Sequence, residues 1–263
     1  MIKHLIILVL LFVWSCEEVT IEQDNPLDPN NPIYNAPNVD FTSGTLEGDT
    51  VYVSDITFTW EGNELIAEYR TKLDDNDWLE WNNGSSIELE HLDEGDHRIS
   101  LQGRYSTGDT SSIITTNFVV DAVMGPALMF FPRRQIAVAG ENVSFQILAE
   151  EVSNLSAAEF QLQFDPSDVQ INDISPGSAF ASLGEMIFIK EIDNVNGFIT
   201  ISTAVFGESY PVFTGTGDIA LIDVQIITSG EHAIQFDGSE VFRDHENSNI
   251  IINDLINGLI TVE

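Results

Sequence analysis

Apolar and polar residues alternate in the middle of the chain, where every second residue from Glu159 to Gln163 is polar and every second residue from Phe160 to Phe164 is apolar. Successive side chains of a β-strand point to opposite faces of its sheet, so this alternation predicts a strand with its apolar side in a core and its polar side in solvent. An Asp-Pro pair then ends the strand with a turn signal. The residues that precede it, from Val152 onward, predict a loop.

Short strand-like runs separated by turn signals fill residues 39–121. The turn signals are rich in Gly, Asn and Asp, as in Glu61-Gly62-Asn63 and Asp93-Glu94-Gly95-Asp96. This density of short strands predicts a β-sandwich. The expected strands are Thr50–Val53, Asp55–Trp60, Ile66–Leu73, Ser86–Leu89, His97–Tyr105 and Ser112–Val120.

Several aromatic, leucine and glycine residues of this region are spaced as in a known module. They are Trp60, Tyr69, Trp78, Leu89, Leu92 and Gly95. Their order resembles that of fibronectin type III and related Ig-like modules, which implies an Ig-like sandwich over residues 39–121. His97 departs from the pattern, because an aromatic residue often follows the glycine at this corner.

A second ordered series of strand-like runs follows a short connector, Val123–Pro126. The series includes Gly140–Ile147, Glu159–Phe164, Ile174–Gly177, Asn196–Ser202, Gly217–Val224 and Asn257–Val262. It resembles a cohesin domain over residues 127–263; cohesins dock dockerin-bearing proteins in cellulosome-type assemblies. The resemblance implies a jelly-roll-like sandwich of the kind that carbohydrate-binding modules share. The expected fold class is therefore all-β, with two β-sandwich domains in tandem.

The N-terminus carries Lys3, an apolar run from Leu5 to Val13 and then Trp14-Ser15-Cys16. This layout predicts a signal peptide over residues 1–15, because the run is too short to span a bilayer. The position of Cys16 resembles a bacterial lipobox, although Trp14 is bulkier than the small residue usual there. The resemblance implies lipidation of Cys16 and an extracytoplasmic protein anchored to a membrane, either the outer membrane or the cell surface. A plain secretory signal with an incidental cysteine is the alternative.

The segment that follows, residues 16–38, is rich in Glu, Asp, Asn and Pro, with Asp24–Pro32 at its centre. Such a composition cannot bury a core and predicts a semi-extended tether. The Asn-Pro-Leu-Asp-Pro run resembles the stalks that follow lipobox cysteines in other bacterial lipoproteins.

The formal charge is −34, from nine Lys and Arg against 43 Asp and Glu. A chain this acidic lacks the basic face that nucleic acid requires, and it cannot bind anionic lipid by charge. The membrane contact is therefore expected through the lipid anchor alone. Two readings of the charge remain open: solubility in an extracellular setting, or attraction of a cationic or calcium-loaded partner.

No arrangement of residues points to catalysis, a metal or a cofactor. Carboxylates are so abundant that pairs arise by chance, and two small sandwiches offer no insertion to build a hydrolase cleft. The acidic run Asp74–Glu80 lacks the spacing of an EF-hand and predicts a solvated hairpin tip. Arg243–Asn247 predicts a turn, and the histidines have no metal-ligand spacing. The sequence thus predicts a binding protein, with an enzyme as a distant alternative.

The cohesin resemblance also implies a binding face for a dockerin-like or other secreted protein in polysaccharide degradation. By position, the candidates are Glu159, Gln161, Gln163, Thr200, Ser202 and Lys190. Ala157 stands where some cohesins have a polar contact residue. A carbohydrate-binding surface lipoprotein is the alternative, because Trp78 and Trp81 lie near a loop. Their odd spacing would place one ring in the core and the other in solvent.

Overall fold

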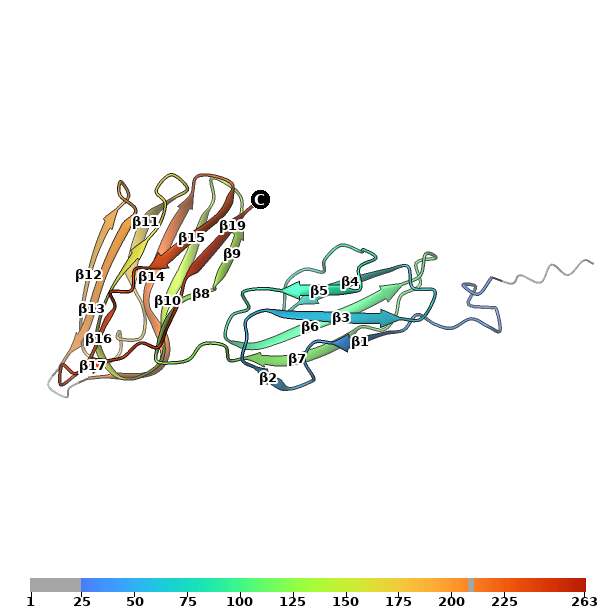
Figure 1. The fold of residues 1–263 in the computed structure, drawn as a ribbon, viewed down its shortest axis with the longest axis horizontal. Helices are drawn as coiled ribbons and strands as arrows, with labels where there is room; N and C mark the ends of the chain where they lie inside the picture. The colour runs from blue at the N-terminus through green and yellow to red at the C-terminus, as the bar shows by residue number, and fades with distance from the viewer. Residues whose placement is uncertain (1–24, 208–210) are drawn as a thin grey trace, which may run out of the picture.

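The computed structural model describes residues 25–207 and 211–263, so the predicted signal peptide and Cys16 lie outside the described residues. The described chain is all-β, and Figure 1 shows two groups of strands lying end to end. No helix long and apolar enough to cross a membrane occurs within these ranges. We call the group β1–β7 the first unit and the group β8–β19 the second unit.

The first unit is a sandwich of two sheets, with strand orders β1-β3-β5 and β2-β7-β6-β4. Its strands are β1 (Val39–Ser43), β2 (Asp49–Val51), β3 (Ile56–Gly62), β4 (Glu68–Leu73), β5 (Ser86–Leu89), β6 (Gly95–Arg104) and β7 (Ile114–Val120). Phe58, Trp60, Ile99 and Phe118 are buried between the sheets. All six expected strands are present with small changes at their ends, and β1 is an additional strand.

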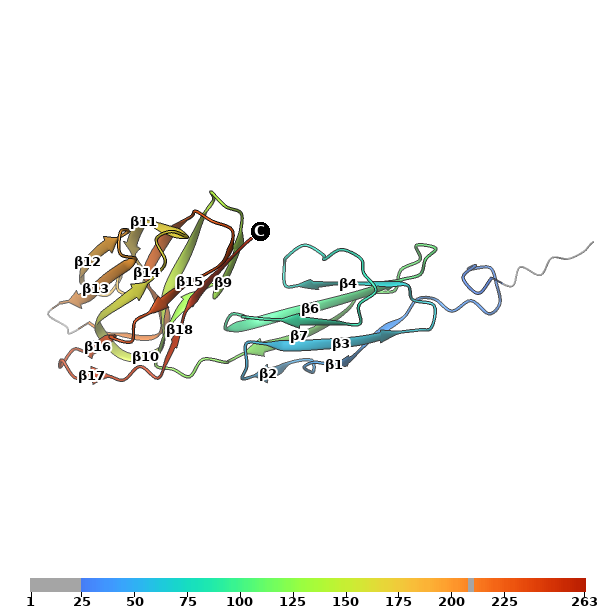
Figure 2. The same ribbon diagram turned by 45° about the horizontal axis from the view of Figure 1, so that its top comes forward.

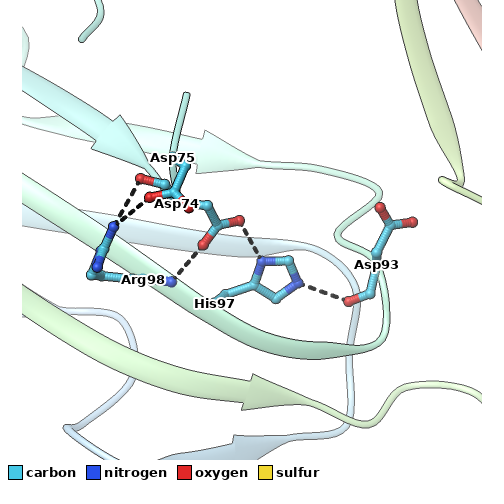
Figure 3. A network of polar contacts seen from close by, with 5 residues as sticks. All are labelled: Asp74, Asp75, Asp93, His97 and Arg98. Atoms are coloured by element: carbon cyan, nitrogen blue, oxygen red, sulfur yellow. Dashed lines mark hydrogen bonds and ion pairs between the residues drawn. The ribbon is translucent and has the colours of Figure 1, made fainter. Parts of the chain in front are cut away.

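His97 closes the corner between β5 and β6. Its Nε2 lies 2.9 Å from the carbonyl oxygen of Asp93, and its Nδ1 lies 2.8 Å from the carboxylate of Asp74 (Figure 3). Ig-like sandwiches commonly fix this corner with a tyrosine hydroxyl bonded to the upstream backbone. The histidine makes an equivalent bond. The Asp74 carboxylate also accepts the backbone N–H of Arg98. The prediction that the whole run Asp74–Glu80 is a solvated hairpin tip is therefore wrong for Asp74, which is bonded to β6.

Trp78 and Trp81 lie over the β4-β6 sheet, and neither belongs to the core cluster. The guanidinium of Arg70 is 4.6 Å from the ring centroid of Trp78 and 4.5 Å from that of Trp81. Arg104 lies 4.4 Å from the Trp81 centroid. The prediction of one core ring and one solvent ring was wrong, because the segment between β4 and β5 is not a strand. Cation–π contact with Arg70 holds both rings on the same side of the β4-β6 sheet.

The segment before β1 is less extended than predicted. Asn25, Asp28 and Asn31 each precede a proline, and each carbonyl oxygen accepts the backbone N–H three residues later. Their side-chain oxygens accept the N–H two residues later. Three consecutive Asx turns therefore coil residues 25–34, because Asp and Asn side chains compete with extended backbone for its donors. Tyr34 then packs edge-on against Tyr105 of the first unit.

The second unit is built around one long strand, β10 (Asn142–Gln163), whose two halves lie in two facing layers of one continuous 12-stranded sheet (Figure 1). The other strands are β8 (Ala127–Phe131), β9 (Arg134–Ala137), β11 (Val169–Pro176), β12 (Glu185–Asp193), β13 (Phe198–Phe206), β14 (Phe213–Ile226), β15 (Gly230–Phe236), β16 (Val241–Asp244), β17 (Asn249–Ile250), β18 (Asp254–Ile256) and β19 (Gly258–Val262). The first half of β10 lies between β14 and β8, and the second half lies between β13 and β16 (Figures 1 and 2).

The passage of β10 from one layer to the other occurs where a loop was predicted. Pairing with β14 shifts register on both sides of Val152, and Glu151 and Asn154 have positive φ angles of 47° and 58°. These irregularities are β-bulges, which bend a strand without ending it. The predicted loop is therefore a bulged part of the strand.

The core of the second unit confirms the predicted register. Phe160 and Leu162 are fully buried, and Phe164 is 7% exposed. The alternate apolar residues of the strand-like runs in this half of the chain belong to one buried cluster, which includes Phe145, Ile147, Phe160, Leu162, Phe164, Ile199, Ile201, Ile222, Val224, Ile260 and Val262. The alternate residues of β10 therefore face outward.

Candidate functional site

The candidate site is the outer face of the sheet formed by β12, β13, the second half of β10, and β16. Strand pairing places its outward residues in rows that cross the strands. One row contains Ile189, Ser202, Glu159 and Val241, and the next contains Ile187, Ala204, Ala157 and Arg243. We call these two rows and their surroundings the outer face.

The outer face has an apolar hollow of about 330 Å³ at its centre. Ile187 and Ile189 line it from β12 and are 48% and 62% exposed. Ala157 and Ala204 form its floor, because their small side chains leave the surface low between larger neighbours. An exposed apolar hollow with a polar rim is typical of a protein-binding surface.

Five of the six predicted site residues lie on this outer face. Ser202 donates a hydrogen bond of 3.0 Å from its hydroxyl to Oε2 of Glu159, so these two side chains act as a pair. Thr200 and Gln161 are cross-strand partners in the next row, and Gln163 is opposite Phe198, which is 43% exposed. The structure thus joins these five residues in one continuous surface.

Lys190 is separated from the other five. It alternates with Ile189 and Glu191 along β12, so its side chain lies on the other side of the strand. Its ammonium donates to Oδ1 of Asp173 and to the backbone carbonyl of Ile174, both in β11. The ammonium of Lys190 keeps the pKa of Asp173 below its usual range. The structure therefore places Lys190 in a contact between the two layers.

Three further residues of the outer face were not predicted from the sequence: Ile187, Ile189 and Arg243. The run from Met186 to Ile189 is apolar on both faces of the strand, so no alternation marks which side is exposed. Arg243 was assigned to a turn, whereas it is the third residue of β16. The turn itself is confirmed just beyond it, where Asp244 accepts the backbone N–H of Glu246 and of Ser248.

One polar cluster, in which His232 is buried, Asp168 is half-buried and Thr228 is exposed, has the residue types of a catalytic triad. His232 Nδ1 lies 3.3 Å from Asp168, and its Nε2 lies 3.0 Å from the backbone carbonyl of Thr228. The hydroxyl of Thr228 donates to Asp168, at 2.9 Å. A nucleophile needs its proton directed to the base, but the Thr228 hydroxyl lies 3.4 Å from Nε2 of His232 and only 2.9 Å from Asp168, to which it donates. The cluster therefore ties the turn before β15 to the start of β11. Among the described residues, no group of three or more His, Cys, Asp or Glu side chains is placed to hold a metal ion.

Comparison with known proteins identifies the second unit. Residues 135–262 match the family model described as the cohesin domain. No curated protein matches the chain.

Solved structures of cohesins are similar to this half of the chain. A non-cellulosomal cohesin from Archaeoglobus fulgidus is 14% identical, with 52% of this chain and 90% of that chain covered and a TM-score of 0.43. A type II cohesin domain from the cellulosome of Acetivibrio cellulolyticus is 16% identical, with 51% and 92% covered and a TM-score of 0.44. The third cohesin of ScaC from the same organism, in complex with the ScaB dockerin, is 23% identical, with 52% and 97% covered and a TM-score of 0.44.

Proposed function

Since the second unit is a cohesin domain, we propose that its outer face binds a dockerin-like module of another secreted protein. The observation that carries the proposal is the apolar hollow between Ile187 and Ile189 on one side and the Glu159–Ser202 pair on the other. A surface of this kind offers an apolar anchor site and a polar rim, which together give a protein interface its affinity and its specificity.

The composition of the outer face favours a protein over a glycan. A glycan-binding sheet needs a flat row of exposed aromatic rings, whereas the hollow is lined mainly by Ile and Ala side chains and by a single aromatic ring, Phe206. The exposed aromatic residues of β13 are Phe198 and Phe206, at its two ends. Eight residues of strand separate them by about 26 Å. The rings of Trp78 and Trp81 lie against Arg70 and are not arranged as an open platform.

The whole chain is proposed to be a non-catalytic lipoprotein of the cell surface or outer membrane that serves polysaccharide degradation. The proposed anchor is the lipidated Cys16, which rests on the sequence pattern around it. Residues 25–34 and the first unit would then hold the cohesin domain away from the membrane. This arrangement would leave the outer face free to capture a partner.

A panel of purified dockerin modules tests the proposal by titration calorimetry. Ile189→Asp places a charge in the apolar hollow and should weaken binding at least tenfold. Ile136→Asp is the matched control, because Ile136 is 63% exposed on β9, on the opposite side of the unit from β12. Replacing Gln161 and Gln163 together by Ala should also weaken binding, while Lys190→Ala should not.

The outcome of the panel is decisive in either direction. Binding by the wild type that survives Ile189→Asp would remove the outer face from consideration. Retention of the protein on insoluble polysaccharide, with no dockerin bound, would favour the carbohydrate-binding alternative. Thermal unfolding of each variant checks that the fold is intact, since exposed substitutions should change stability by no more than about 0.5 kcal/mol.

A further inference from the structure

Arg243 is a cation on the outer face that lacks an anionic partner. Its side chain is half-buried and lines the apolar hollow together with a neighbouring hollow of about 370 Å³. Among the described residues, its guanidinium makes one long hydrogen bond, of 3.5 Å, from Nη1 to the backbone carbonyl of Asn247. Within residues 25–207 and 211–263, no carboxylate lies at ion-pair distance from its guanidinium.

The other cations of the second unit are all paired. Arg133 pairs with Glu94, Arg134 with Glu90, and Lys190 with Asp173. The chain has 43 acidic residues, so the lack of a carboxylate beside this guanidinium is a local feature of the fold and does not reflect a shortage of acidic side chains. A partly desolvated guanidinium without a counter-ion is unfavourable, and a bound carboxylate would relieve that cost.

The nearest candidate partner within the sheet is held away from Arg243. Glu159 lies one row from Arg243 on the adjacent strand, where it is paired with Val241. The hydroxyl of Ser202 bonds the Glu159 carboxylate on its β13 side, opposite to β16. The Glu159–Ser202 bond therefore leaves the guanidinium of Arg243 open to an incoming group.

We propose that Arg243 selects partners that carry an aspartate or glutamate on the docking surface. The proposal rests on the proposed function, and it specifies which dockerin-like partners the outer face accepts. Arginine binds a carboxylate through two parallel N–H···O bonds, which gives directional preference as well as affinity. An acidic side chain would meet Arg243 while an aliphatic side chain of the same partner fills the hollow at Ile187 and Ile189.

The spacing of strands sets the separation of these two groups on the partner. Arg243 and Ile187 belong to one row that crosses β16, β10, β13 and β12. Three strand spacings amount to about 14 Å. A helix lying across the strands covers that distance in about nine residues. Side chains that share one face of a helix recur at separations of seven or eleven residues, which span about 10 Å and about 16 Å and bracket that distance. The preferred partner helix therefore has an acidic residue seven or eleven positions from an Ile, Leu or Val.

Selection from a displayed library tests the proposal. The library consists of dockerin modules in which the solvent-facing helix positions are randomised, and it is selected separately against the wild type and against Arg243→Glu. Wild-type binders should be enriched in Asp or Glu at one helix position, and Arg243→Glu binders in Lys or Arg at the same position. For a single wild-type binder, Arg243→Gln should weaken affinity about tenfold to a hundredfold.

Two controls separate this proposal from the proposed function. Lys72→Glu, in the first unit, changes the charge equally and should leave selection and affinity unchanged. Binders that are lost on Ile189→Asp, yet show no acidic enrichment and tolerate Arg243→Gln, would overturn the role of Arg243 and keep the outer face as the docking site. A library that yields no binder to the wild type would overturn the proposed function and, with it, the selection by Arg243.

Discussion

Arg133 of the second unit lies 2.6 Å from Oε1 of Glu94, at the corner of the first unit. The side chains are only 7% and 17% exposed, so the ion pair is buried at the junction of the two units. The backbone N–H of Arg133 also donates to Asp93, at 2.6 Å. His97 in turn bonds the backbone carbonyl of Asp93. The corner loop that contains Asp93 and Glu94 therefore contacts β6 of the first unit on one side and Arg133 of the second unit on the other.

Glu94→Ala should destabilise the junction by about 3 kcal/mol, because it leaves the charge of Arg133 buried and unpaired. The control is Glu90→Ala. Glu90 lies 3.8 Å from Arg134, and the Glu90 side chain is 52% exposed, so its loss should cost no more than about 1 kcal/mol. Urea unfolding followed by tryptophan fluorescence measures both. Equal costs for the two variants would show that the buried pair does not hold the junction.

The stability of the junction region should depend on pH through Glu150. Burial raises the pKa of Glu150 above its usual value, and the nearby charge of Glu151 raises it further, against an opposing hydrogen bond from Thr216. A carboxyl with a raised pKa stabilises the fold below its unfolded pKa, and that contribution is lost as pH rises through the folded pKa. Stability should therefore fall as the pH rises from about 4.5 through the raised pKa of Glu150 in the folded protein.

Glu150→Gln isolates this effect, since the amide stays neutral at every pH. The variant should gain stability over the wild type at pH 7.5 and show little difference at pH 4. Glu231→Gln, an exposed carboxylate on β15, serves as the control and should not reproduce the pattern. Urea unfolding at the two pH values measures the difference, and an effect of equal size at both would exclude desolvation of Glu150 as its cause.

Phe160→Ala should cost about 3–5 kcal/mol, because it removes a fully buried ring from the core of the second unit. The ring centroid of Phe160 is 6.1 Å from that of Phe236, which would lose its neighbour. Gln161→Ala, one residue along the strand, should be nearly neutral. Differential scanning calorimetry measures both, and a mild effect of Phe160→Ala would contradict the close packing of this core.

His97→Ala should destabilise the first unit by about 1–3 kcal/mol, because the carbonyl of Asp93 and the carboxylate of Asp74 both lose a partner. His97→Tyr should cost less, since a phenol hydroxyl at this corner can bond the upstream backbone as in related sandwiches. Chemical unfolding ranks the three proteins. A tyrosine variant less stable than the alanine variant would show that the imidazole's bond to Asp74 dominates.

Cys16→Ala should release the protein from the membrane, because a polar tether cannot replace buried acyl chains. Mass spectrometry of the native protein should find an acylated Cys16 at the N-terminus, with residues 1–15 removed. A mature N-terminus at another residue, or a free thiol at Cys16, would refute the lipid anchor and leave a plain secretory signal.

The sequence by itself determined the class of the fold and the register of its central strand. The alternation from Glu159 to Phe164 is a period of two, and one buried face allows only one register, so Phe160 had to lie inside and Glu159 outside. The order of strand-like runs was enough to indicate the cohesin domain that the family comparison matches. These features are local, because they depend on neighbours along the chain.

Only the tertiary structure decided which side chains share the outer face. Ile187 and Ile189 lie in a run that is apolar on both sides, and nothing in that run shows that the core covers the side of Met186 and Phe188 and leaves the other side open. The pairing of β16 with β10 carries Arg243 to the hollow, and the contact with Asp173 removes Lys190 from it. Such placements depend on pairing between strands far apart in sequence, which hydrophobic periodicity does not encode.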